Sequence, residues 1–112
     1  MKGSYLGELE ELILLMVGIL HPQAYGVAVM DEIEKQLDRK LNISAVHAVL
    51  TRLQDKGYVS SLMSGSTQER GGRRKRIFNL TALGKRALAE ANEMRSQMFN
   101  QIPKMALQFR PL

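Results

Sequence analysis

Residues 42–63 read NISAVHAVLTRLQDKGYVSSLM, and this stretch decides the fold. Asn42 and Ser44 belong to the residue types that cap helix N-termini, and the apolar residues after them recur at steps of three and four. This spacing predicts an amphipathic helix from about Ser44 to Lys56, which ends before Gly57. The last six residues of the stretch have a strand-like period instead, so we expect a β-strand directly after the helix.

The predicted helix has two contrasting faces. Its buried stripe consists of Val46, Val49, Leu50 and Leu53. The opposite face carries short or polar side chains, namely Ser44, Ala45, His47, Ala48, Thr51 and Arg52. A face that only contacts solvent more often carries Glu and Lys, whereas short side chains let a helix backbone approach another surface closely. Taken alone, the helix fits an ordinary surface as well as a DNA groove.

Two more helices are predicted ahead of this one. The first covers Leu6 to Leu20, and His21-Pro22 stops it, because a residue that precedes proline avoids the helical region. The second covers Ala24 to Leu37 and has one apolar and one charged face. Three acids occupy the first turn of the first helix, where the helix dipole favours negative charge, and we interpret them as dipole partners: Glu8, Glu10 and Glu11.

A hairpin and a fourth helix complete the chain. The strands are expected at Tyr58 to Met63 and Lys75 to Leu80, with a long glycine-containing tip between them, and this hairpin is called the wing below. Thr81 is the expected cap of the last helix, and Pro103 is expected to end or bend it. We therefore divide the chain into a winged helix-turn-helix domain (1–81), a dimerisation helix (82–102) and an unassigned tail (103–112).

The order of these elements defines the fold class. We predict a mostly α chain with a small β-hairpin, arranged as a winged helix-turn-helix with a C-terminal dimerisation helix. In a helix-turn-helix the second helix of the pair enters the major groove of DNA. That recognition helix is the one from Ser44 to Lys56.

The charge distribution agrees with this reading. The net charge of the chain is +5, with an isoelectric point near 9.8. Residues 1–40 hold four Lys/Arg against seven Asp/Glu (net −3), residues 41–86 hold nine against two (net +7), and residues 87–112 hold three against two (net +1). Five cations stand within seven residues of the wing: Arg70, Arg73, Arg74, Lys75 and Arg76. Their density favours phosphate binding over a merely solvated loop.

Several short pieces of the sequence occur in an order and spacing that resemble a known family. They are Leu6-Gly7, Tyr25-Gly26, Arg52-Leu53, Lys56-Gly57-Tyr58, Gly72 to Arg76 and Leu80-Thr81-x-x-Gly84. Over roughly residues 6–98 the chain resembles the PadR-type bacterial transcriptional regulators, in the short form with a single C-terminal helix. The resemblance implies a DNA-binding homodimer, usually a repressor, in which the C-terminal helix packs against the first helix of the partner.

The resemblance also implies roles for particular residues. The DNA contacts would come from the exposed face of the recognition helix and from the five wing cations, all named above. The dimer contacts would come from apolar positions on the first and last helices: Leu12, Met16, Ala87, Leu88, Ala91, Met94 and Met98. His47 departs from the family pattern, because a tyrosine is common at that place in the recognition helix. The base preference of the family therefore does not carry over.

Some family members bind a small molecule at the dimer interface and then release DNA. The last helix of this chain has no aromatic residue between Ala82 and Met98. Such an effector is therefore a possible partner that the sequence does not identify.

The sequence excludes several other classes of protein. There is no P-loop, no Gly-x-Ser-x-Gly and no cysteine, so we expect neither an enzyme nor a bound cofactor. His21 and His47 lie far apart without metal-ligand spacing, and no metal site is expected. The nine-residue apolar run Leu12 to Leu20 is too short to span a bilayer, no signal peptide precedes it, and we expect a cytoplasmic protein without a membrane partner.

Two alternatives remain open at this point. A basic winged helix can also bind structured RNA by shape, and a winged helix can act as a protein-interaction module. The basic segment has few aromatic residues for base stacking, with only Tyr58 and Phe78 nearby, which counts against RNA. The net charge of +7 in residues 41–86 counts against a pure protein adaptor.

Overall fold

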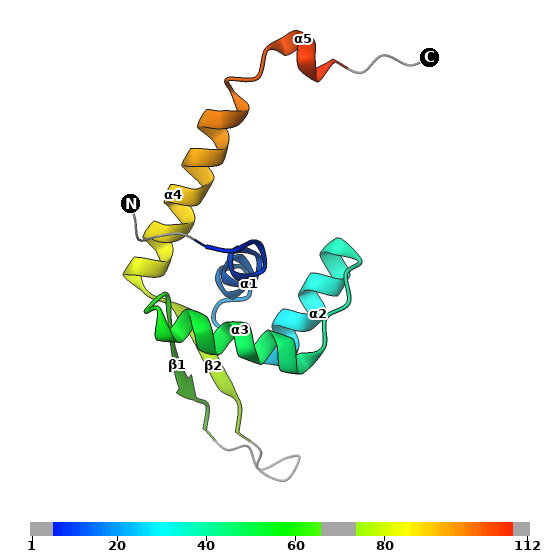
Figure 1. Ribbon diagram of the computed structural model, residues 1–112. Coiled ribbons are helices and arrows are strands. Elements are labelled where there is room, and N and C mark those ends of the chain that lie inside the picture. The colour runs from blue at the N-terminus through cyan, green and yellow to red at the C-terminus, as the bar shows by residue number, and fades with distance from the viewer. Residues whose placement is uncertain (1–5, 66–73, 109–112) are drawn as a thin grey trace.

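The computed structural model describes residues 6–65 and 74–108. Seven elements follow one another within these two described ranges (Figure 1). They are α1 (Glu8–Ile19), α2 (Gly26–Leu37), α3 (Ile43–Asp55), β1 (Val59–Met63), β2 (Arg76–Leu80), α4 (Ala82–Phe99) and α5 (Lys104–Leu107). The prediction of a mostly α chain with a two-stranded antiparallel hairpin is confirmed.

The core lies where α1, α2, α3 and the hairpin meet. Ile13 and Leu14 of α1, Ile33 of α2 and Leu50 of α3 have no exposed surface, and Phe78 of β2 is also buried. Complete burial of one such aliphatic side chain contributes about 1.5–3 kcal/mol of transfer free energy. The buried stripe predicted for α3 is confirmed, because all four of its residues are in this core.

The hairpin is attached to the helices at the middle of β2 and just after its last residue. Its strands pair antiparallel from Val59 opposite Leu80 to Met63 opposite Arg76. The N–H of Phe78 donates to the carbonyl oxygen of Ala24 at 2.8 Å, which ties β2 to the segment before α2. These bonds fix the direction in which the wing leaves the core.

The start of α4 is held tightly just after the last residue of β2. Thr81 caps the helix by accepting from the N–H of Gly84 at 3.0 Å, and its hydroxyl donates to the carbonyl oxygen of Gly57 at 2.6 Å. A Cβ atom on Gly84 would collide with the backbone carbonyl of Tyr58, so only glycine permits this approach. The prediction that Thr81 caps the last helix is confirmed.

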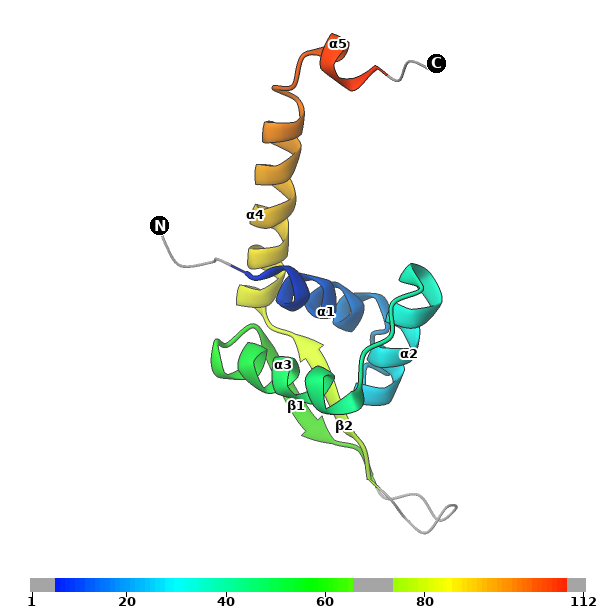
Figure 2. The same ribbon diagram turned by 45° about the vertical axis from the view of Figure 1, so that its right-hand side comes forward.

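Beyond its first turns α4 leaves the core. Only Gly84 and Ala87 of this 18-residue helix are buried. Figures 1 and 2 show α4 projecting from the body of the molecule on the side opposite to the wing. The chain therefore presents its two extensions in opposite directions.

Several predicted boundaries shift by one to three residues. The recognition helix begins at Ile43, because Asn42 is its cap and accepts from the N–H of Ala45 at 2.7 Å. The last helix ends at Phe99, before Pro103, and Pro103 instead precedes α5 inside the tail that the sequence left unassigned. Among the described residues, no helix is long and apolar enough to cross a membrane.

Candidate nucleic-acid interface

The recognition helix α3 presents the predicted face to solvent. Ser44, His47 and Ala48 are exposed, and so are Thr51 and Arg52 one turn later, while Ala45 is half-buried. The face is therefore narrow, and its N-terminal part is built from short side chains. This shape permits a close approach of the helix backbone to another surface.

His47 packs against the beginning of α2. A Cβ atom on Gly26 would lie only 2.6 Å from Cε1 of the His47 ring, so the ring occupies the space that a side chain at position 26 would take. A larger residue at position 26 would therefore have to displace the exposed His47 ring. The contact holds the imidazole beside the first turn of α2.

A groove of about 470 Å³ connects α3 with the wing. Its residues come from the start of α2, from α3 and from the start of β2: Tyr25, Gly26, Val27, His47, Arg74, Lys75 and Arg76. We call it the wing groove. It brings His47 of the predicted helix face together with three of the five predicted wing cations.

The three described wing cations are each held by a neutral partner. Nε of Arg74 donates to the carbonyl oxygen of Ser64 at 3.2 Å, and Arg76 donates to the hydroxyl of Ser61 at 2.9 Å. Nζ of Lys75 lies 4.1 Å from the centroid of the Tyr25 ring, a cation–π contact. Among residues 6–65 and 74–108 no carboxylate pairs with these three cations, so within this part of the chain their charge is available to an anion. Arg70 and Arg73 lie outside the described residues.

Arg52 has a different surrounding from the one predicted. Its Nε donates to Glu10 of α1 at 3.1 Å, and Lys56 at the end of α3 donates to the same carboxylate at 2.9 Å. Arg52 was predicted to contact DNA, and unlike the described wing cations it is paired with a carboxylate of the same chain. The sequence reading missed this cluster because it assigned Glu10 to the helix dipole alone.

Glu10 is the buried charged residue of the described chain, with 7 % of its surface exposed. Burial acts to raise the pKa of Glu10, but hydrogen bonds from Lys56, from the N–H of Gly7 and from Arg52 outweigh it, so the pKa lies below its usual value. The carboxylate is therefore ionised at neutral pH and fastens α1 to the C-terminal end of α3.

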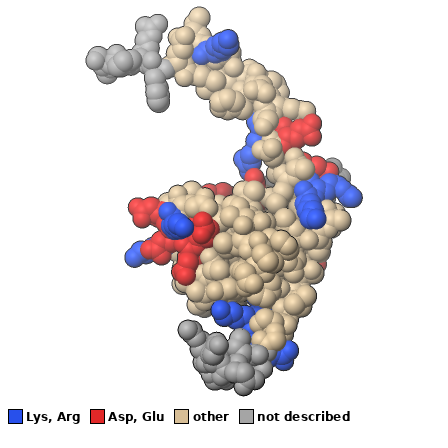
Figure 3. All heavy atoms as spheres, turned by 180° about the vertical axis from the view of Figure 1, so that it is seen from behind, with Lys and Arg blue, Asp and Glu red and all other residues tan. Residues whose placement is uncertain are grey.

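Two further acids of the same turn pair with other parts of the molecule. Glu11 accepts from Arg95 of α4 at 2.7 Å, and Glu8 accepts from Arg39, just after α2, at 3.4 Å. The first turn of α1 is thus a charged junction between α3, α4 and the end of α2. Figure 3 shows other Lys and Arg side chains at the base of the wing, far from this junction.

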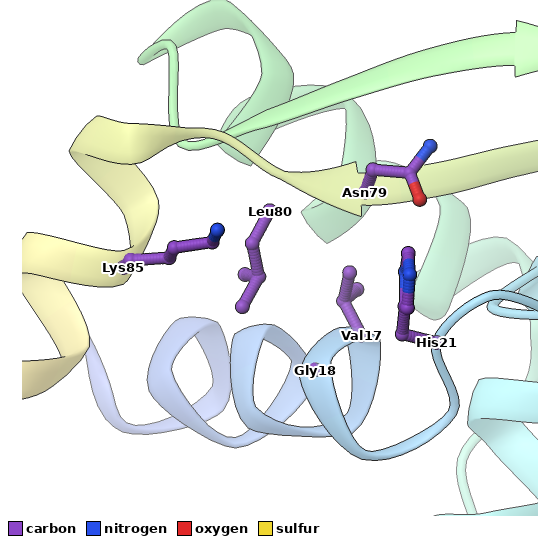
Figure 4. A pocket seen from close by; sticks show the side chains of 6 residues that line it. All are labelled: Val17, Gly18, His21, Asn79, Leu80 and Lys85. Carbon is purple, nitrogen blue, oxygen red and sulfur yellow. The ribbon is translucent and has the colours of Figure 1, made fainter.

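A second hollow of about 240 Å³ lies between α1, β2 and α4 (Figure 4). His21 and Asn79 lie side by side at one end, Lys85 reaches in from the other end, and the apolar side chains of Val17 and Leu80 lie between them. Sequence reasoning placed His21 in a loop without a role, and nothing in its sequence neighbourhood indicates this hollow. No group of three or more His, Asp or Glu suited to a metal occurs in residues 6–65 and 74–108.

Comparison with known proteins places the chain in a family. The model of the family described as "Transcriptional regulator PadR-like family" matches residues 14–90. The chain belongs to this family. Its members are transcription regulators and not enzymes, as the sequence led us to expect. No curated protein matched the sequence.

Solved structures share the fold of this PadR-like chain. A PadR-like transcription factor from Bacteroides fragilis has a TM-score of 0.70 and 23 % identity, over 82 % of this chain and 84 % of that one. A PadR family regulator from Clostridium difficile has a TM-score of 0.69 and 20 % identity, over 91 % and 100 %. Bacillus subtilis PadR, solved in complex with operator DNA, has a TM-score of 0.60 and 18 % identity, over 94 % of this chain and 50 % of its own.

The residues predicted for the dimer interface of the PadR-like chain fall into two groups. Met16 and Ala87 are buried in the core of the single chain, with 3 % and 1 % of their surfaces exposed, so they are corrected to core residues. Their helical spacing marked an apolar face but did not reveal that the same chain covers it. The other five retain surface for a partner: Leu12, Leu88, Ala91, Met94 and Met98.

The Glu10 cluster leads to a prediction about acid stability. A group whose pKa is lower in the folded state stabilises the fold above its unfolded pKa, and this contribution is lost as the pH falls through the folded pKa. At pH 7, Glu10→Gln should lower the free energy of unfolding by about 1–3 kcal/mol, because two charge-assisted hydrogen bonds become weaker. Below about pH 5 the wild-type protein should lose stability more steeply than the variant, so that the two curves converge.

Urea unfolding at one fixed protein concentration, repeated from pH 7 to pH 3, measures both effects. Glu34→Gln is the matched control, because Glu34 pairs with Lys40 at 3.9 Å on the surface. An exposed pair contributes about 0–1 kcal/mol, so this control should remain close to wild type at every pH. Parallel curves for wild type and Glu10→Gln would contradict the assignment.

Proposed function

We propose that the chain is a homodimeric, sequence-specific DNA-binding regulator that acts as a repressor on an inverted-repeat operator. Membership of the PadR-like family supports regulation of transcription. A relative with the same fold, Bacillus subtilis PadR, was solved in complex with operator DNA, and this supports DNA as the partner. A regulator of this kind acts where the chromosome is, so the proposal includes a cytoplasmic location.

One observation carries the proposal: His47, on the exposed face of α3, and three wing cations that pair with no carboxylate among the described residues border the same groove. His47 lies on α3, and Arg74, Lys75 and Arg76 line the opposite wall. A major groove about 12 Å wide admits a helix, while the adjacent phosphates need cations beside that helix. The wing groove supplies both on one side of the molecule.

The two walls of the groove then have different tasks. Ser44, His47, Ala48 and Thr51 would face base edges, where hydroxyl and imidazole groups can donate or accept hydrogen bonds. The wing cations would bind phosphates, which fix the register of the protein but carry no sequence information. Arg52 would contribute chiefly to the α1–α3 junction, because Glu10 already holds it.

The homodimer is proposed through α4 and α1. Apolar side chains of α4 stand exposed far from the core, such as Met94 at 52 % and Met98 at 62 %. Leu15 and Ile19 on α1 are exposed as well. A two-fold pair of chains would bury these faces and place two recognition helices about 34 Å apart, one turn of DNA. A small-molecule effector at this interface remains part of the proposal without an assigned chemistry.

Selection of bound fragments from random duplex DNA tests the proposal. We expect a palindromic consensus with two half-sites whose centres are about 10 base pairs apart. Single-stranded DNA and structured RNA serve as competitors, and neither should displace the selected duplex. Preference for RNA would favour the shape-binding alternative, and the absence of any nucleic-acid binding at moderate salt would favour a protein-interaction module. A consensus that overlaps a promoter and lowers its transcription would support the repressor role.

The division of tasks predicts different effects for Arg74 and Thr51. Arg74→Ala should weaken binding to all duplexes alike, and the slope of log affinity against log salt should become shallower by about one unit for each protomer. Thr51→Ala should leave the salt slope unchanged and reduce discrimination between operator and mutated operator by about 1–3 kcal/mol. Binding isotherms over a salt series measure both.

Lys35→Ala is the control for charge alone. Lys35 is an exposed cation in the last turn of α2, whereas the first turn of α2 borders the wing groove. Its removal changes the net charge as much as Arg74→Ala does, yet it should hardly alter the salt slope. If all three variants had the same sequence-independent effect, the assignment of base and phosphate contacts would be wrong.

The proposed dimer predicts that Met94→Glu yields a monomer, because the interface would have to bury an unpaired charge. Asn92→Glu is the matched control. It lies two residues away on the same helix, a rotation of about 200°, and therefore faces the other side. Light scattering should show a dimer for wild type and Asn92→Glu and a monomer for Met94→Glu. An unchanged dimer in Met94→Glu would place the interface elsewhere.

A further inference from the structure

Two consecutive carboxylates of α1 link the two functional helices to each other. Glu10 binds Arg52 and Lys56 of α3, and the next residue, Glu11, binds Arg95 of α4. Neighbouring residues on a helix point about 100° apart, so one turn of α1 can hold one helix on each side. Neither link is local in sequence, since Glu10 and Arg52 are 42 residues apart and Glu11 and Arg95 are 84 apart.

The ion pair between Glu11 and Arg95 lies far from the packed start of α4. Ala87 is the last buried residue of α4, and Arg95 lies eight residues further along. At 1.5 Å per residue this distance is about 12 Å of helix. The side chain of Glu11 is only 16 % exposed, so it is a fixed anchor, while that of Arg95 is 60 % exposed and lies about one turn beyond Ala91, the last half-buried residue of the helix. The ion pair therefore restrains the swing of α4 about its packed first turns.

The angle of α4 matters because α4 is the proposed dimer contact. In a two-fold dimer, the distance and the rotation between the two recognition helices follow from the angle between α3 and α4 in each protomer. One added base pair between half-sites rotates one of them by about 34–36° around the DNA axis. A rigid junction would reject such an operator, and a loose junction would accept it at a smaller loss.

We propose that Glu11 and Arg95 are specificity-determining residues, which set the half-site spacing that the dimer accepts by fixing the angle of α4 relative to the recognition helix. Glu10 contributes by making α1 and α3 one body, so that Glu11 acts on α3 through α1. This inference rests on the proposed function, because it requires a dimer formed by α4 and DNA reading by α3. In this inference Glu11 and Arg95 determine which half-site spacing the dimer accepts, and they do not contact DNA themselves.

The test uses the palindromic duplex recovered by the selection above, with zero, one or two base pairs inserted between its half-sites. The measured quantity is the spacing penalty, the ratio of the dissociation constants for the inserted and the original duplex. An exposed ion pair changes an equilibrium by about 1.4- to 5-fold, and a dimer contains two, so Arg95→Met should reduce the penalty by about 2- to 25-fold. Affinity for the original duplex should change less than the penalty does.

Arg86→Met is the matched control. Arg86 is an exposed arginine on the same helix, and among the described residues no ion pair holds it. Its replacement removes the same charge from α4 and should leave the wild-type penalty unchanged. Glu11→Gln breaks the link from the other side and should match Arg95→Met, and the double variant should show no larger effect than either single one.

The outcomes separate the inference from the proposed function. If wild type yields no selected palindrome, the proposed function fails before spacing is tested. If wild type binds the palindrome but tolerates inserted base pairs, or if Arg95→Met and Glu11→Gln keep the full penalty, the inference is overturned while the proposed function stands. The inference would also be overturned if Arg95→Met lost the same affinity for duplexes of every spacing. A spacing penalty that Arg86→Met reduced as much as Arg95→Met would overturn it too.

Discussion

The buried carboxylate of Glu10 is the interaction on which the arrangement of the helices depends. An ionised group with so little exposed surface is costly unless it is fully paired, and here one carboxylate accepts from Lys56, Arg52 and the N–H of Gly7. The cost of burial forces these donors to remain in place. As a result, the end of α3 cannot turn away from the start of α1 without exposing or orphaning a charge.

The same cluster divides the cations of the chain into two classes. Arg52 and Lys56 share the carboxylate of Glu10, which compensates half of their combined charge within the protein. Arg74, Lys75 and Arg76 are held by a carbonyl oxygen, an aromatic ring and a hydroxyl, which orient them without cancelling their charge. An approaching polyanion therefore meets cations without a carboxylate partner among the described residues at the wing, and a partly compensated cluster at the C-terminal end of α3. This difference supports a footprint that is centred on the wing groove.

The sequence predicted what depends on local periodicity and missed what depends on distant partners. The stripe of α3 and the cap at Thr81 could be predicted, because both follow from residues within one or two turns. The pairing of Arg52 could not, since its partner is 42 positions away and first-turn acids have a local explanation in the helix dipole. Met16 was assigned to a partner for a similar reason: spacing identifies an apolar face, and only the tertiary structure shows what covers it.

The single chain does not explain what stabilises the long exposed part of α4. An isolated helix of this length is only marginally stable in water, and most helical stability in proteins comes from packing of an apolar face. Beyond Ala91 every residue of the helix is exposed, and Met94, Met98 and Phe99 are more than half exposed. The ion pair at Arg95 fixes the direction of the helix but buries little apolar surface. A second copy would supply the missing apolar contact, so the same junction that orients α4 would orient the whole dimer.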